Sequence, residues 1–337
     1  MKMTSNYDKI VESISALLDE VQRKNESLNK DNSIFILKKA NQSLADASKI
    51  DNPRSLWKEF WYEGEVCCLF SDSNLGKSIY AVQIANEISK TDKVLYFDFE
   101  LTEKQFQLRY TSDKDNTLYK FPDNLIRGEL DLEKLDPMTF EEDAVNEILK
   151  AAINAGCKIV IIDNLTYLCS AMENAEAAGL VMKNLIAIKK QYGFSFLILA
   201  HTPKRNLWAK ITQNDLAGSK RLYNLFDSVF AIGQSAKDEN LRYIKQLKVR
   251  WGAKSFGELH VIIARIEKID NFLQFVETGF AKEIEHLIQN DEEIKEEINK
   301  QIMILRKQGK SLREIAKQTD TPKSTVDDII KRNEKNK

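Results

Sequence analysis

The sequence predicts an α/β fold with a mostly parallel sheet, built around a phosphate-binding loop. Three observations lead to this prediction. An apolar run that opens at Val66 is followed at once by the motif SDSNLGKS at residues 71–78, and a helix pattern comes directly after it. Strand and helix patterns then alternate as far as about Val276, as they do when crossover helices join parallel strands. Two later β-branched runs also end in polar residues.

Composition describes a water-soluble globular protein with several structural units. The 337 residues are 43% hydrophobic and 30% charged, and no apolar run approaches the length of a membrane span. The first residues, MKMTSNYDKIVESI, lack the apolar core of a secretion signal, so we expect a cytoplasmic protein. Cys67, Cys68, Cys157 and Cys169 show no metal-ligand spacing and are expected as buried thiols.

Composition and breaks in pattern predict four segments. Residues 1–52 form a helical lead-in with apolar faces at 7–22 and about 34–47, which either packs on the main domain or contacts another subunit. An ATPase-like α/β domain covers 53–280, and a helical connector covers 281–299. Helix is expected to begin at Phe280, and the acidic stretch Asp291–Glu297 is expected to be a solvated connection. Residues 300–337 carry eleven basic and five acidic residues, so this tail has a net charge of +6 and the rest of the chain −7.

The motif at residues 71–78 has the context of a P-loop. Backbone N–H groups of such a loop point at an anion, and the positive end of the following helix adds to the attraction. The nucleotide-binding residues are therefore expected to be Ser71, Asp72, Ser73, Asn74, Leu75, Gly76, Lys77 and Ser78. Lys77 would reach the β and γ phosphates and Ser78 would bind Mg²⁺. Because Ser71 replaces the first glycine of the motif, we expect the chain to enter the loop in an extended conformation. The alternative is a chance G-K-S after a strand.

The second strand pattern, KVLYFDF at residues 93–99, places Glu100 at its carboxyl end. Ligands of open α/β sheets gather at that edge, so Glu100 is a candidate to orient or deprotonate the water that attacks the γ phosphate. The alternative is that this carboxylate caps the helix expected at residues 102–110.

Two further strand patterns end in candidate site residues. KIVIID at residues 158–163 ends in Asp163, a candidate to hold the hydrated Mg²⁺. FSFLILA at residues 194–200 is followed by His201, where a polar side chain can sense the γ phosphate. A lone histidine can equally be structural.

The segment 203–219 is long, polar and basic. Its Lys204, Arg205, Trp208 and Lys210 suit a single nucleic-acid strand, because cations neutralise phosphates and the indole stacks on a base. A plain surface loop is the alternative.

A later strand pattern, YIKQLKVR at residues 243–250, places Lys248 and Arg250 on one face, since strand side chains repeat every two residues. Two such cations can act on the nucleotide of a neighbouring subunit as a finger. The alternative is a solvated strand face.

The tail has the pattern of a helix-turn-helix. Gly309 ends one helix, Ser311–Glu314 forms a capping box for the next, and Thr321–Pro322 begins a third. Lys323, Ser324 and Thr325 would face the major groove of duplex DNA, and Lys331 and Arg332 would contact phosphates. Alternatively, the unit packs on the body or on a partner protein.

Over about residues 61–276 the sequence resembles the RecA-type ATPases of the DnaB and RepA hexameric-helicase group. The motifs that carry this resemblance, besides the phosphate loop, are DFELTEKQ, IIDNL, LAHTPK and KVRWG. The resemblance implies a RecA-like core that uses ATP and Mg²⁺, with Glu100 as catalytic glutamate, Asp163 as Walker B acid, His201 as γ-phosphate sensor, and Lys248 and Arg250 acting in trans in a homo-oligomer such as a hexamer. The tail resembles the helix-turn-helix of resolvase-type DNA-binding domains, with Ala316, Val326 and Ile329 at core positions.

Two functions are therefore expected. The first is a DNA-associated ATP-hydrolysing motor, a helicase or replication protein of a plasmid or mobile element. The second is a non-translocating regulatory or recombination-mediator ATPase. The large N-terminal domain of replicative helicases has no counterpart in this sequence.

Overall fold

The structure, a computed structural model, describes residues 35–36, 38–131, 133–134, 140–168, 175–202, 209–216, 220–287, 291–319 and 321–335. Its helices are α2 (Ala40–Ala47), α3 (Lys77–Ile88), α4 (Glu103–Arg109), α5 (Phe140–Ala155), α6 (Leu165–Leu168), α7 (Ala175–Tyr192), α8 (Lys220–Leu225), α9 (Asp291–Lys307), α10 (Leu312–Thr319) and α11 (Lys323–Lys335). Short 3₁₀ turns are η1 (Gln213–Asp215) and η2 (Glu283–His286).

The strands are β1 (Ser55–Trp57), β2 (Trp61–Tyr62), β3 (Val66–Ser71), β4 (Val94–Asp98), β5 (Leu125–Gly128), β6 (Ile159–Asp163), β7 (Ser195–His201), β8 (Ser228–Gln234), β9 (Leu241–Lys248), β10 (Val261–Ile269) and β11 (Phe272–Ala281). Nine of the described strands form one sheet in the order β11-β10-β9-β8-β3-β7-β6-β4-β5. The run from β8 to β5 is parallel, and β9, β10 and β11 are added antiparallel to it. The predicted α/β fold with a mostly parallel sheet is confirmed.

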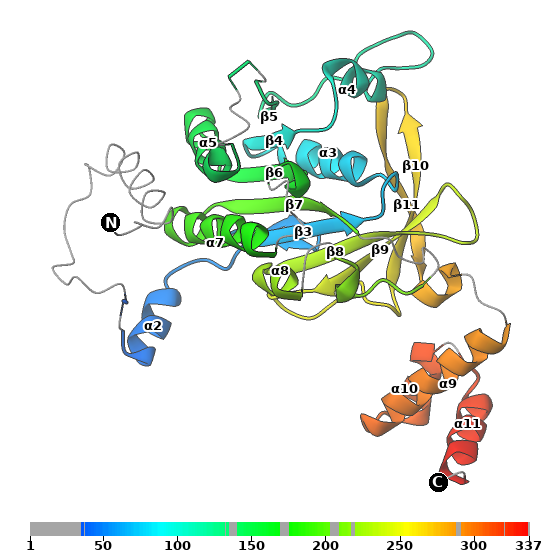
Figure 1. Ribbon diagram of the computed structural model, residues 1–337. Coiled ribbons are helices and arrows are strands. Elements are labelled where there is room, and N and C mark those ends of the chain that lie inside the picture. Colours follow the sequence, from blue (N-terminus) through cyan, green and yellow to red (C-terminus); the bar gives the residue numbers. More distant parts are fainter. Residues whose placement is uncertain are drawn as a thin grey trace.

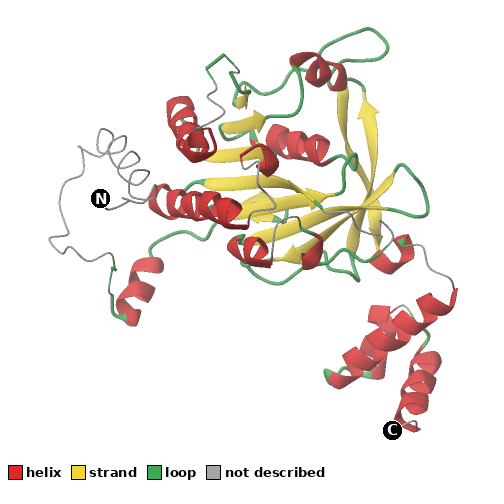
Figure 2. Cartoon of the chain, viewed as in Figure 1, coloured by secondary structure: helices red, strands yellow, loops and turns green. Residues whose placement is uncertain are grey.

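Helices cover both faces of this sheet (Figures 1 and 2). Side chains alternate along β3, so that Val66, Cys68 and Phe70 pack toward α5, α7 and α8. Cys67 and Leu69 pack on the other face, toward α3 and the β1–β2 hairpin. Burial on both faces explains why the central strands read as unbroken apolar runs. The described cysteines Cys67, Cys68 and Cys157 are buried free thiols, as expected.

The antiparallel strands β10 and β11 extend the sheet around the far side of α3. Gln83 of α3 fixes this arrangement with two hydrogen bonds to the backbone of Phe275, as donor at 3.0 Å and as acceptor at 2.9 Å. The expectation of helix from Phe280 was wrong, because β11 continues to Ala281. The apolar residues that follow, Ile284 and Leu287, lie in and just after the short turn η2.

Near the C-terminus, α9, α10 and α11 form a three-helix unit around Ile302, Ile315, Val326 and Ile330. Ala316 and Ile329 pack at its margin. The capping box is present, since Ser311 Oγ accepts from Glu314 N–H and Glu314 accepts from Ser311 N–H. The stretch Asp291–Glu297, expected as a solvated connection, is the first half of α9, so this helix crosses the predicted boundary at residues 299/300.

At the N-terminus, the second predicted helix is α2, which is shorter than the pattern at 34–47 suggested. The first predicted helix, at 7–22, lies outside the described residues.

Candidate active site

The loop after β3 has the conformation of a phosphate-binding loop. Ser71 is the last residue of β3, so the chain enters the loop extended, as expected from the missing glycine. Gly76 precedes α3 with φ of +93°, and a Cβ there would lie 2.7 Å from the side chain of Ile266. The left-handed backbone conformation favours glycine at this position. The backbone N–H groups of the loop therefore lie next to the N-terminus of α3.

Lys77, the first residue of α3, has its ammonium inside this loop. Its Nζ donates to the carbonyl oxygens of Ser71 at 2.9 Å and of Asp72 at 3.1 Å. Burial lowers the pKa of Lys77, and the carboxylates of Asp163, Glu100 and Asp72 act in the opposite direction. Asp72 in turn accepts a 2.5 Å hydrogen bond from Thr202, which ties the loop to the residue after β7.

Ser78 and Asp163 lie together beside the loop. The carboxylate of Asp163 is hydrogen-bonded by Ser78 and, at 2.7 Å, by the hydroxyl of Tyr96. Burial raises the pKa of Asp163 to about 6, although both hydrogen bonds act to lower it. A hydroxyl and a carboxylate are ligand types that Mg²⁺ accepts, with water and substrate phosphates completing its shell. Within the described ranges no group of three or more His, Cys, Asp or Glu residues could hold a metal ion by itself.

Glu100 follows β4, and hydrogen bonds with Asp98 and Arg127 fix the turn that contains it. Asp98 accepts hydrogen bonds from the N–H groups of Glu100 at 3.2 Å and of Leu101 at 2.9 Å. The other oxygen of Asp98 accepts from Arg127 of β5 at 2.9 Å, and Arg127 also donates to the carbonyl of Leu101 at 2.8 Å. The helix that follows is capped by Thr102, so the alternative role of Glu100 as a cap does not apply.

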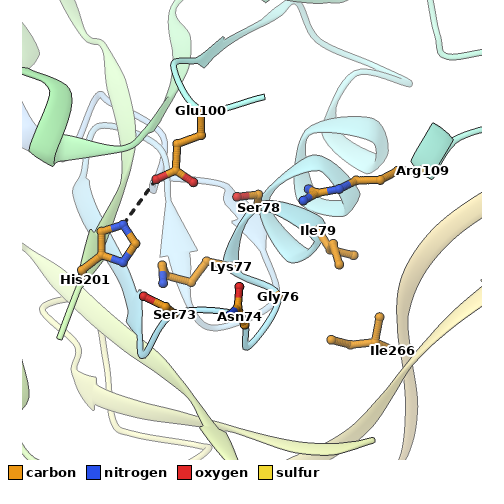
Figure 3. A pocket seen from close by; sticks show the side chains of 10 residues that line it. All are labelled: Ser73, Asn74, Gly76, Lys77, Ser78, Ile79, Glu100, Arg109, His201 and Ile266. Atoms are coloured by element: carbon orange, nitrogen blue, oxygen red, sulfur yellow. Dashed lines mark hydrogen bonds and ion pairs between the residues drawn. The ribbon is translucent and has the colours of Figure 1, made fainter. Parts of the chain in front are cut away.

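Three side chains from neighbouring strand ends meet at one side of the loop. His201 Nε2 lies 3.3 Å from Glu100 Oε1 (Figure 3). It also lies 2.9 Å from Asn164 Nδ2, and Asn164 donates to Glu100. The hydrogen bond from His201 lowers the pKa of Glu100 more than burial raises it. Glu100 is thus an ionised carboxylate with two polar neighbours. Sequence reasoning missed Asn164, although its place directly after Asp163 was a usable signal.

The loop opens into a cavity of about 420 Å³ with two distinct ends. Glu100 and His201 line one end, and Arg109, Ile79 and Ile266 line the other (Figure 3). Arg109 of α4 was not predicted. One of its terminal nitrogens is buried and has no hydrogen-bond partner among the described residues, and the side chain adds a positive charge to this end of the cavity. The cavity therefore combines an anion-binding loop, an acidic end and a mixed apolar and cationic end.

Lys248 and Arg250 lie at the opposite edge of the sheet from this cavity. Arg250 contacts Asp227, whose carboxylate accepts from the N–H of Val66 at the start of β3. The phosphate loop begins at the other end of β3, about 16 Å away along the strand. The two cations lie close together, but β9 ends at Lys248, so Arg250 does not lie on the same strand face as the pattern predicted. Neither cation reaches the loop of its own chain.

The predicted nucleic-acid contacts are placed only in part. Lys204, Arg205 and Trp208 lie outside the described residues. Lys210 is described, and its ammonium lies 3.6 Å from a carboxylate oxygen of Glu258. In the three-helix unit, Lys323, Ser324 and Thr325 are exposed on the first turn of α11. Lys331 and Arg332 are exposed on the same helix, where Lys331 pairs with Asp327 at 2.6 Å.

Comparison with known proteins gives one family. Residues 37–206, just over half of the chain, match the AAA domain family. Among solved structures, the KaiC-like protein PH0186 from the hyperthermophilic archaeon Pyrococcus horikoshii OT3 is similar at 11% identity with a TM-score of 0.45, over 64% of this chain and 91% of that chain. No curated protein matches the sequence. The helices of the described residues include none that is both apolar and long enough to cross a membrane.

Proposed function

Because this chain belongs to the AAA domain family of P-loop ATPases, we propose that it hydrolyses ATP as a DNA-associated homo-oligomer. The observation that supports this most strongly is the assembly of Lys77, Ser78, Glu100, Asn164 and His201 at the carboxyl ends of adjacent parallel strands. Four segments far apart in the sequence converge on the place where a γ phosphate would lie.

Each of these residues has a role that its chemistry supports. The loop N–H groups and Lys77 bind the β and γ phosphates. Glu100, kept ionised by its hydrogen bonds, orients and deprotonates the attacking water. Asn164 and His201 hold Glu100 and respond to the γ phosphate. Ser78 and Asp163 would hold Mg²⁺, which neutralises charge that develops on the phosphate oxygens.

The other end of the cavity suits the rest of the nucleotide. Ile79 and Ile266 offer apolar surface, and the guanidinium of Arg109 offers positive charge and hydrogen-bond donors. A base or ribose with acceptor atoms fits such a surface. We therefore place the nucleoside at this end and the γ phosphate at Glu100.

An oligomer completes the site. Among the described residues that line the cavity, the lysine and arginine are Lys77 and Arg109, and Arg109 lies at the nucleoside end. We propose that a further cation at the γ phosphate comes from another subunit, and Arg250 and Lys248 are the candidates because they lie at the far edge of their own sheet. Head-to-tail contacts close into a ring when the rotation between subunits allows it, and we propose a hexameric ring.

DNA is the proposed partner. The segment 203–219 follows Thr202, which is hydrogen-bonded to Asp72 of the phosphate loop, and we propose that a single strand bound by this segment affects hydrolysis. The three-helix unit carries exposed Lys323, Ser324 and Thr325 at the start of α11, as a helix-turn-helix that reads duplex DNA would. The proposed protein is therefore a helicase or replication protein of a plasmid or mobile element.

The experiment that tests this function measures two activities of the purified full-length protein. We expect Mg²⁺-dependent ATP hydrolysis that single-stranded DNA accelerates, and ATP-dependent separation of a forked duplex. Lys77→Ala is the control for both, since it removes the cation that binds the phosphates. Hydrolysis without strand separation at any protein concentration would exclude the helicase and favour a non-translocating regulator or recombination mediator. Absence of hydrolysis would exclude both.

Removing the three-helix unit is expected to weaken duplex binding and to spare basal ATP hydrolysis. The cut belongs before Asp291, where α9 begins, because a cut at residue 300 would leave half of a helix. The unit has its own core, and the two cores that surround the sheet do not include its residues. We expect the slope of log K against log salt to become shallower by about 0.9 for each DNA phosphate that the shortened protein no longer neutralises.

Fluorescence anisotropy at two salt concentrations measures this effect. The full-length variant Lys331→Gln/Arg332→Gln should reproduce part of the decrease in affinity. Lys300→Gln/Lys307→Gln is the matched control, because it removes the same charge from exposed positions on α9. Unchanged duplex affinity after the truncation would assign the unit to protein contacts instead.

A further inference from the structure

The ammonium group of Lys248 is fully hydrogen-bonded within its own subunit. Its Nζ lies 3.4, 3.1 and 2.6 Å from the carbonyl oxygens of Tyr223, Asn224 and Phe226. An ammonium has three N–H donors, so these three acceptors use all of them. The carbonyls in the last turn of a helix lack donors within the helix, and Tyr223 and Asn224 belong to the last turn of α8. Lys248 is therefore the C-terminal cap of α8.

Arg250 has the opposite character. Its side chain is 62% exposed, and its contact in the structure is a 3.1 Å ion pair with Asp227. Asp227 is only 3% exposed and is anchored through its other oxygen, which accepts from the N–H of Val66 at 2.8 Å and from Lys189 at 2.6 Å. A guanidinium has five donors in a planar fork. Arg250 can therefore keep Asp227 and still present donors to an external anion.

These contacts meet at one point of the fold. Phe226 and Asp227 are the two residues between α8 and β8, and Lys248 pairs with Val229 at the start of β8. Lys248 thus fixes the end of β9 against the α8–β8 junction, and Asp227 fixes the side chain of Arg250 to the same junction. The direction in which Arg250 leaves the surface depends on both contacts.

We propose that Arg250 alone is offered to the neighbouring subunit's nucleotide, and that Lys248 and Asp227 are positioning residues that hold it. This inference rests on the proposed oligomeric ATPase and divides between the two cations a role that the sequence assigned to both. If Lys248 entered a neighbour's site, its ammonium would have to leave three carbonyl oxygens, two of which would then lack a donor at the end of α8. Arg250 can act without such a cost.

A double-mutant cycle tests this division of roles. The four proteins are the wild type, Lys248→Met, Arg250→Ala and the double variant, with kcat for ATP and nucleotide affinity measured for each. A residue that acts only through Arg250 has no effect once Arg250 is gone. We expect Lys248→Met to lower kcat at unchanged nucleotide affinity, and the double variant to be no slower than Arg250→Ala. Lys254→Met is the matched control, because Lys254 is an exposed lysine of the segment between β9 and β10, and it should keep full kcat.

The possible outcomes are distinct. Decreases in kcat that multiply in the double variant would mean that Lys248 contacts the nucleotide independently, and this would overturn the division of roles alone. Full kcat in Arg250→Ala would overturn both the proposed contact between subunits and the division of roles. Should Lys248→Met be unstable, the same cycle with Asp227→Asn provides the second test, because the amide oxygen still accepts from Val66 while the ion pair with Arg250 is removed.

Discussion

Glu100→Gln is expected to slow ATP hydrolysis by a factor of about 10² to 10⁴, the range for removal of a positioned general base. The substitution keeps the size of the side chain and an oxygen that can accept from Asn164. It removes the negative charge that deprotonates or orients the water. Because Lys77 and the loop remain intact, nucleotide binding should stay nearly unchanged.

Two measurements separate catalysis from binding in this variant. Single-turnover hydrolysis reports the chemical step, and the affinity for a nucleotide is measured at equilibrium in the same buffer. Glu103→Gln is the matched control, because it makes the same chemical change at an exposed position on the first turn of α4 and should leave hydrolysis intact. Full hydrolysis by Glu100→Gln would remove this residue from the mechanism.

The parts of the site that could be predicted from the sequence are those that lie within one continuous segment or at the end of a strand. The strand β3, the loop and α3 are contiguous, so local pattern was sufficient. Glu100, Asp163 and His201 were predicted one by one because each lies at the end of an apolar run, and parallel strands bring such ends to one edge. Their approach to one another followed from sheet topology.

The missed residues depend on side-chain direction, which pattern alone does not give. Asn164 bridges Glu100 and His201 because of how the chain leaves β6, and Arg109 enters the cavity because α4 turns its last residue toward α3. Two elements were also misread. The outer half of β11 is largely exposed and lacks a clear alternation, so Phe280 was grouped with the apolar residues that follow it. The charged first half of α9 resembled a connection because it has few apolar residues.

The strand pattern at residues 243–250 placed Lys248 and Arg250 on one strand face, but β9 ends at Lys248 and Arg250 lies beyond it. The pattern also could not distinguish their roles. The difference lies in partners that are remote in sequence, the end of α8 for Lys248 and Asp227 for Arg250. A sequence pattern predicts the strand face on which a residue lies, whereas these partners determine whether its charge is available to another subunit.

Arg250→Ala is expected to lower ATP turnover by roughly 10³ or more, the value of a cation that stabilises the transition state of phosphoryl transfer from a neighbouring subunit. The affinity of an isolated subunit for nucleotide should not change, since Arg250 lies at the far edge of its own sheet. Arg265→Ala is the matched control, because Arg265 is another partly exposed, ion-paired arginine and is not placed at any proposed interface.

Mixing variants tests whether Arg250 acts across an interface. Lys77→Ala has an intact Arg250 and a defective loop, and Arg250→Ala has the reverse, so each is nearly inactive alone. In a mixed head-to-tail ring, some phosphate loops of Arg250→Ala subunits face the intact Arg250 of a Lys77→Ala subunit. The nucleotide site at such an interface has both a working loop and a working arginine. At equal amounts about one interface in four has this arrangement, so turnover should recover toward about a quarter of the wild-type value. No recovery at any ratio, in oligomers shown to contain both variants, would make Arg250 a residue that stabilises its own subunit through Asp227.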